Sequence, residues 1–162
     1  MDKAEFLGFY KTIHRPSAKL IGLAPADSLA WRPAEANMMN LGQLLRHLGA
    51  CPRHLATAAR NAFPPPAEFT RANEEALLHT ATPEEAGRSL EANYAEAVQA
   101  IEALSEDDFQ RKQIAVPWGP PSPMHMALIF MAMHQSNHKM QLFLYLKILG
   151  FAVNTMTLYM GK

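Results

Sequence analysis

Four long stretches, in which apolar residues recur at three- and four-residue spacing, constrain what this chain can fold into. In the first stretch, Asp2 can cap the start of a helix, and Pro16 is expected to kink or restart it. In the second, Asn40 stands three residues before Gln43, which is a capping-box pattern for a helix that runs to about Phe63. Both stretches therefore predict helices with defined starting points.

The third stretch has the strongest start signal, because Thr82–Glu85 offers a threonine cap, a proline at the first helical position and a glutamate at the third. The fourth stretch begins at Ser122-Pro123 and ends near Leu149, with Gly150 placed to take a left-handed conformation. The tail, residues 151–162, is expected to be irregular. Four helices are thus predicted along the chain.

The fold class that follows is all-α, a four-helix bundle formed by residues 1–162 as a single domain. Alternation typical of strands and hairpins is not apparent in the sequence. Crossing a bundle of about 30 Å takes roughly ten extended residues, and all three connectors are longer than that. The lengths of the connectors therefore leave the order of the helices in space open.

Composition excludes several classes of protein. Fifteen Lys and Arg residues balance fifteen Asp and Glu residues, so the positive field that nucleic-acid binding requires is missing. The longest wholly apolar run, Met126–Met133, is far shorter than the ~20 residues that span a membrane. The N-terminus carries charges where a secretion signal needs apolar residues, and the single cysteine, Cys51, suits a reducing compartment. We therefore expect a cytoplasmic protein that binds neither nucleic acid nor membrane.

Three of the seven histidines have positions that suit a metal site. His134 and His138 are four residues apart, so their rings project from one face of the fourth helix. The zinc-protease signature needs a glutamate after the first histidine, and Gln135 stands there instead. His47 lies among leucines on the second helix. Three imidazoles from two facing helices could bind one metal and leave positions open, or all three could be polar residues packed at a helix interface.

The remaining candidates are less specific. His14, His54, His79 and His125 are interpreted as surface or boundary residues, with His14 exposed. Cys51 shares the face of His47, where it could either add a fourth ligand or pack as a small apolar group, and we favour packing.

Two motifs identify a family resemblance. The residues Trp31-Arg32-Pro33 and Asn40–Leu48 (Asn-Leu-Gly-Gln-Leu-Leu-Arg-His-Leu), followed by the pattern from His134 to Gly150 that includes His138 and Gln141, resemble the DinB-like (damage-inducible) family. The resemblance spans about residues 21–159. One departure lies at residues 139–140, where Lys-Met replaces the usual Arg-Gly, and it is expected to alter packing without removing a ligand.

The resemblance implies a four-helix bundle with a long crossover between the second and third helices. It also implies a divalent metal, zinc or nickel, held by His47, His134 and His138. Some relatives transfer low-molecular-weight thiols, which implies a small thiol and an electrophile as substrates. A metal site of this kind lowers the pKa of a coordinated thiol, and the thiolate is the competent nucleophile. Hydrolysis by an activated water, or a helical stress-response module without catalysis, are the alternatives.

Further residues extend this hypothesis. Gln141 is placed to orient a ligand, whereas Trp31 and Trp118 in the connectors are candidates for the walls of a pocket. No general base is identified. Five of the ten methionines lie in residues 124–140, and the apolar run there predicts a homodimer formed through the fourth helix.

Overall fold

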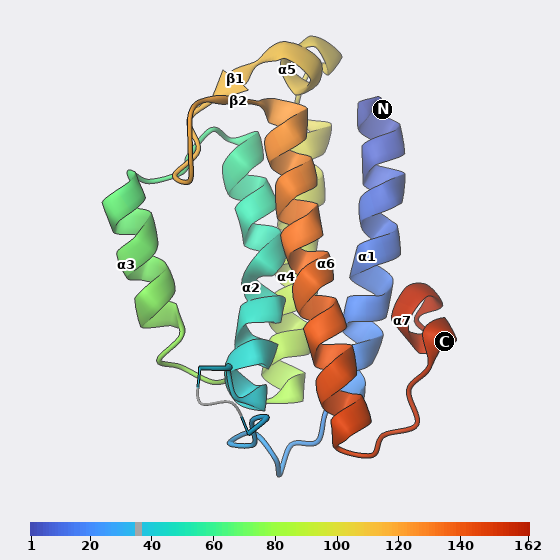
Figure 1. Cartoon of the computed structure of the whole chain (residues 1–162). Helices are drawn as coiled ribbons and strands as arrows, with labels where there is room; N and C mark the ends of the chain where they lie inside the picture. The colour runs from blue at the N-terminus through green and yellow to red at the C-terminus, as the bar shows by residue number, and fades with distance from the viewer. Residues whose placement is uncertain (35–36) are drawn as a thin grey trace.

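The computed structural model describes residues 1–34 and 37–162, and four long helices stand side by side in it (Figure 1). The long helices are α1 (Lys3–Leu23), α2 (Leu41–Ala59), α4 (Pro83–Glu102) and α6 (Met124–Ile148). The connectors contain short elements: α3 (Pro66–Ala76), α5 (Glu106–Arg111), α7 (Thr155–Met160), and the paired two-residue strands β1 (Gln113–Ile114) and β2 (Ser122–Pro123). The predicted all-α bundle is confirmed.

The helices begin where the capping signals predicted. The side chains of Asp2, Asn40 and Thr82 each accept a hydrogen bond from the backbone three residues on, and the third residue of each helix returns one. Each such cap contributes about 1 kcal/mol. Both α1 and α2 continue through their internal prolines rather than restarting there. Helix α2 ends at Ala59, a few residues before the predicted end, because Asn61 adopts a left-handed conformation with φ of 52°.

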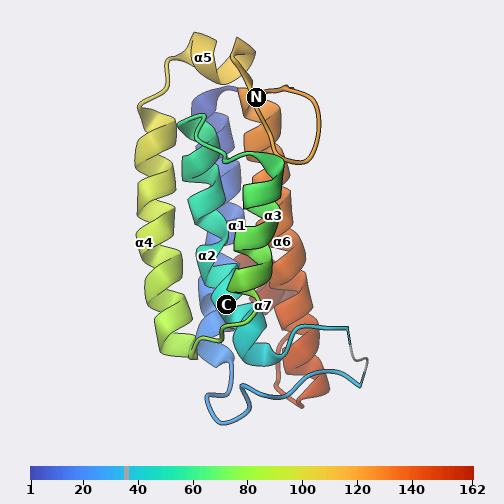
Figure 2. The ribbon, with the colours of Figure 1, turned by 90° about the vertical axis from the view of Figure 1, so that its left-hand side faces the viewer.

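The order of the helices follows from their directions. In Figures 1 and 2, α1 and α6 run downwards, whereas α2 and α4 run upwards. Helix α2 packs against α4 and α6, and α1 packs against the same two helices. Because α2 and α4 are parallel neighbours, the chain must return along the outside of the bundle between them, and α3 lies on that return. This segment is the long crossover that the family resemblance implied.

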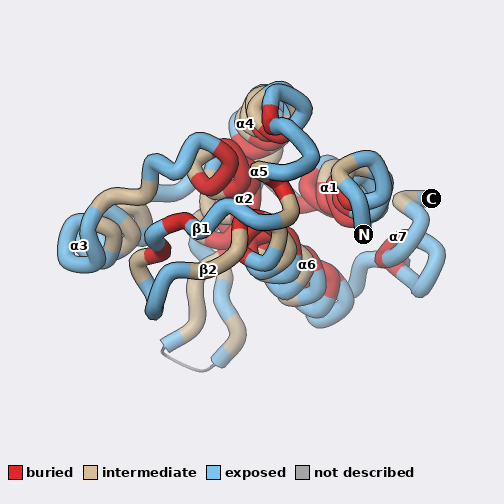
Figure 3. Tube along the Cα trace, turned by 90° about the horizontal axis from the view of Figure 1, so that it is seen from above, coloured by how far each residue is buried: buried red, intermediate tan, exposed pale blue. Residues whose placement is uncertain are grey.

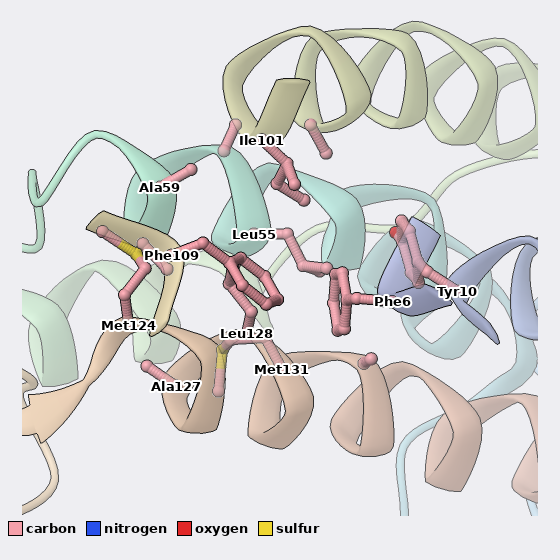
Figure 4. Packing of buried hydrophobic residues seen from close by; sticks show 14 of the residues in the cluster. Phe6, Tyr10, Leu55, Ala59, Ile101, Phe109, Met124, Ala127, Leu128 and Met131 are labelled. Carbon is pink, nitrogen blue, oxygen red and sulfur yellow. The ribbon is translucent and has the colours of Figure 1, made fainter. Parts of the chain in front are cut away.

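Two buried clusters fill the bundle, one above the other. The upper cluster, shown in Figure 4, packs Phe6, Leu55, Phe109 and Leu128 from four different helices. The lower cluster includes Leu45 and many other leucines. On α2 and α6 the two clusters meet at mid-height. Side chains at mid-height, where α2 faces α6, therefore lie between the upper and the lower buried cluster, and both clusters fix their positions.

The connectors contain more structure than the sequence predicted. The tail, expected to be irregular, forms α7, because the Asn154 side chain caps it by accepting from the backbone N–H groups of Met156 and Thr157. Helix α7 then packs on α1. The connector at residues 105–121 contains α5 and the small antiparallel pair, and the connector between α2 and α4 contains α3. Gly150 has the predicted positive φ, 87°.

Helix α6 keeps one apolar face on the surface. The side chains on it are 37–64% exposed and follow helical spacing along the whole length: Met126, Phe130, Met133, Met140, Leu144 and Ile148. These six side chains carry no charge, which suits packing against the same face of a second copy. The homodimer stays a prediction, and light scattering of the purified chain would measure it. None of the helices in the described parts of the chain combines the length and hydropathy needed to cross a membrane.

Candidate metal centre

The three predicted histidines come together on the seam between α2 and α6. The Nε2 atoms of His47 and His134 are 3.0 Å apart. The ring centroid of His138 lies 4.3 Å from that of His47 and 4.6 Å from that of His134. His47 is near the start of α2 and His138 is past the middle of α6, so only antiparallel helices bring them to one level. The bundle has that arrangement (Figure 1).

An adjacent face of α6 is fixed by a different set of contacts. Gln135 is fully buried and accepts a hydrogen bond from the Tyr10 hydroxyl at 2.8 Å, while its amide donates to Ser17 Oγ at 3.3 Å. Both partners belong to α1. Since Gln135 turns towards α1, the neighbouring His134 turns towards α2. The glutamine that replaces the zinc-protease glutamate thus sets the rotation of α6 about its axis.

Burial keeps the imidazoles of the site neutral. Burial and the neighbouring histidines lower the pKa of His47 to about 3, and burial, followed by His138 and His54, lowers the pKa of His134 to about 4. Burial also lowers the pKa of His138, opposed by its hydrogen bond to Gln141. At neutral pH these rings therefore carry free nitrogen lone pairs, which is the protonation state in which histidine binds metals.

A chain of hydrogen bonds orients His138. Its Nδ1 lies 3.0 Å from the amide oxygen of Gln141, so Nδ1 carries the proton and donates it to that oxygen. The Gln141 amide donates to the Tyr145 hydroxyl at 3.1 Å, and that hydroxyl donates to the backbone carbonyl of Met39 at 2.8 Å. The chain leaves Nε2 of His138 as its unprotonated nitrogen. The contact with Gln141 would let it orient His138 if His138 binds a metal.

Cys51, for which the sequence analysis favoured a packing role, lies next to two of the histidines. Its sulfur and one ring nitrogen each of His47 and His134 lie within 4.8 Å of one another, and this group could hold a metal ion. His138 is outside that tightest group, although its ring is adjacent. The cysteine is fully buried, and burial raises the pKa of its thiol, so the sulfur is protonated in the protein alone. A metal here could therefore be bound by the three histidines alone or by the histidines together with Cys51.

A cavity of about 220 Å³ opens beside His47 and His134. His54 lines it, with its ring 6.4 Å from that of His134. The interpretation of His54 as a bystander missed this position, although its spacing of seven residues from His47 places both on one face of α2. Trp118, one of the two tryptophans considered as pocket walls, also lines the cavity. Trp31 does not: it packs edge-on against Tyr145, with centroids 5.3 Å apart, behind the chain of hydrogen bonds.

The other histidines lie away from the site. His14 was expected to be exposed, but it is only 6% exposed and stacks on Tyr94 with a centroid distance of 3.7 Å. His125 approaches the backbone carbonyl of Gln110 at 3.1 Å, and His79 is exposed after α3. The departure from the family motif at Met140 is on the surface, where that side chain is 37% exposed, so the longer residue fits without displacing a core neighbour.

Comparisons with known proteins agree with this geometry. The sequence matches the DinB superfamily over residues 12–142, so the chain belongs to that family. A crystal structure of a DinB-like protein from Bacillus subtilis is similar in fold, with 18% sequence identity and a TM-score of 0.68, covering 91% of this chain and 93% of that one. A comparison with curated protein sequences gives no significant match.

Proposed function

We propose that this protein is a divalent-metal-dependent enzyme that transfers a small thiol to an electrophile. His47, His134 and His138 would hold the metal, zinc or nickel. The observation that carries the proposal is the 3.0 Å separation of two imidazole nitrogens from different helices, directly beside a cavity. Packed helices could keep two histidines apart at little cost, so their convergence on one point favours a shared ligand over simple packing.

The donor set fits a metal. Nitrogen ligands bind zinc at ~2.0–2.1 Å, so two of them on one tetrahedral ion lie about 3.3–3.4 Å apart. The Nε2 atoms of His47 and His134, at 3.0 Å, need to separate only by a few tenths of an ångström to reach that spacing. Three neutral imidazoles would leave the ion its full charge, and three protein ligands are typical of catalytic rather than structural zinc.

A metal held there would lower the pKa of a thiol or a water and so supply a nucleophile at neutral pH. The residues supply the remaining requirements. Gln141 fixes the tautomer of His138. His47 and His134 are neutral and share a hydrogen bond between their Nε2 atoms, so the donor ring would move its proton to Nδ1 before both Nε2 atoms could bind a metal. In the transfer, a bond forms between sulfur and carbon, the thiol proton leaves to solvent, and any leaving group departs with its bonding electrons.

Two alternatives are supported by particular observations. Hydrolysis would use the same three histidines, with water in place of the thiol. A structural metal in a non-catalytic helical module is favoured by the position of Cys51, because four protein ligands would close the site. The cavity beside His47 and His134 favours catalysis, because it gives a substrate access to the ligands.

The transfer is tested with chelator-treated chain reconstituted with zinc or nickel and supplied with a low-molecular-weight thiol and an electrophile. We expect the rate of thioether formation to rise at least tenfold over that of the metal-free chain, because the uncharged thiol is a poor nucleophile. Product formation is followed by mass spectrometry. Equal rates with and without metal would exclude the transferase, and release of a hydrolysis product alone would favour the hydrolase.

Replacing Cys51 with serine decides between an open and a closed site. We expect Cys51→Ser to keep one metal per chain, because the fully buried sulfur belongs to the lower core cluster and burial raises its thiol pKa. Elemental analysis of wild type and variant measures this. Loss of metal from the folded variant would instead identify Cys51 as a fourth ligand and support the structural role.

A further inference from the structure

Helix α3 does not close on the bundle. Every residue of α3 is at least partly exposed, and the helix stands apart from α2 and α6 (Figure 3). At its C-terminal end, Arg46 donates to the carbonyl of Ala76 at 2.9 Å, and Gln43 donates to the carbonyl of Leu77 at 2.6 Å. Near its N-terminal end, Phe69 holds it through aromatic contacts. Because α3 contacts the rest of the protein mainly near its two ends, a cavity of about 220 Å³ lies between its middle and the bundle.

The walls of this cavity are aromatic and uncharged. Its lining consists of three imidazoles, three aromatic rings, a thioether and one amide: His47, His54, His134, Phe69, Trp118, Phe130, Met131 and Asn73. Trp118 stacks on Phe130 with centroids 5.2 Å apart and lies 6.1 Å from Phe69. Trp118 and Phe130 remain 39% and 51% exposed. A cluster of aromatic side chains is thus assembled around space that none of the described residues fills.

The chemistry of the walls selects the class of ligand. An ionised group moved into the cavity would lose hydration without meeting a countercharge on the lining side chains. A flat aromatic molecule would find ring faces and edges at stacking distance. Since an apolar cavity of ~150 Å³ binds benzene, a cavity of about 220 Å³ has room for a molecule with two fused rings.

We propose that the electrophile handled by this protein is a flat, mainly aromatic molecule bound between α3 and the bundle, and that the part of it resting on the platform formed by Phe69, Trp118 and Phe130 is uncharged. Its role as a substrate rests on the proposed function, whereas its binding requires only the cavity. The inner end of such a molecule reaches His47 and His134, which line the same space. Helix α3 is therefore the element that determines substrate specificity.

The test is calorimetric titration of the full-length, chelator-treated chain with 2-naphthol and with 2-naphthoate, which share a ring system and differ in charge at neutral pH. Chelation removes metal that would attract the carboxylate. We expect 2-naphthol to bind one per chain, at least tenfold more tightly than 2-naphthoate. Equal affinities would overturn the proposed selection against charge.

Variants of α3 locate the binding. Asn73→Phe fills the cavity and Phe69→Ala removes part of the platform, and each is expected to weaken 2-naphthol binding at least tenfold. Glu75→Phe places the same ring on the exposed side of α3 and is expected to change affinity less than twofold. Circular dichroism verifies that each variant is folded. Unchanged binding in folded Asn73→Phe and Phe69→Ala would place the probe elsewhere and refute the proposal.

The two proposals can fail separately. If 2-naphthol binds as expected but metal does not increase thiol transfer, the cavity stands and the proposed reaction is wrong. If thiol transfer depends on metal but neutral and anionic probes bind equally, the reaction stands and the substrate class is wrong.

Discussion

Replacing His134 with alanine is expected to reduce bound metal from about one ion per chain to less than a tenth. The variant removes one of three imidazoles and leaves His47 without the nitrogen that now lies 3.0 Å from it. Loss of an orienting partner alone costs 10–100-fold in metal affinity, so loss of a ligand should cost more. Elemental analysis of protein purified without a metal-affinity tag measures the content.

His125→Ala is the matched control, because it removes an imidazole from the same helix outside the site. We expect it to keep its metal.

The metal affinity of Gln141→Leu should lie between those of His125→Ala and His134→Ala. We expect this variant to bind metal about 10–100-fold more weakly than wild type, because His138 loses the partner that orients it. Thermal unfolding gives an independent readout, since a metal that binds only the folded chain raises its stability. A full complement of metal in His134→Ala would remove this histidine from the ligand set.

Metal-free protein is expected to lose most of its stability between pH 6.5 and about pH 4.5. The pKa of an unfolded histidine is 6.5, whereas in the folded chain it is about 3 for His47 and about 4 for His54 and His134. Below pH 6.5 the unfolded chain therefore binds protons that the folded chain does not, and the free energy of unfolding falls as the pH falls. This stability is fully present above pH 6.5.

The expected effect is large. Each histidine contributes up to about 1.4 kcal/mol per pH unit in this window, and three together up to about 4 kcal/mol per pH unit. Since a domain is stable by about 5–15 kcal/mol, acid unfolding should occur near pH 5. Urea unfolding at a series of pH values, with chelator present, measures the slope.

Two histidine variants test whether buried imidazoles cause this sensitivity to acid. His54→Leu removes one buried imidazole and should make the slope shallower, so that unfolding needs a lower pH. His79→Gln removes an exposed imidazole after α3 and should leave the profile unchanged. A free energy of unfolding that stays constant from pH 7 to pH 4.5 in wild-type protein would contradict the neutral, buried state of the site.

Much of the fold was predictable because its signals are local. The caps at Asp2, Asn40 and Thr82 act within one turn, so the sequence places the helix starts closely. Helix ends and connectors were less predictable. Helix α7 has a local cap at Asn154, but it is only six residues long and also depends on packing against α1. The strands β1 and β2 depend on pairing across a loop, which leaves no strong local pattern.

In the candidate site, too, the features that belong to a single helix were predictable and those that depend on packing were not. The spacing of His134 and His138 and the face of His47 are properties of single helices and can be read from the sequence. Only the antiparallel arrangement of α2 and α6 brings His47 to the level of the other two (Figure 1). His54 and Trp118 share a cavity only because α3 and the loop between β1 and β2 cover that side of the bundle.

Helical periodicity and capping are encoded over a few residues, so the class of fold, the four long helices with their starting points, and the shared face of His134 and His138 can be read from the sequence. Four further features depend on the tertiary structure: the direction of each helix, the rotation of α6 through Gln135 and Tyr10, the proximity of Cys51 to the histidines, and the cavity under α3. Those features depend on contacts between residues far apart in the chain, where long connectors permit several arrangements and only the packing of the whole core selects one.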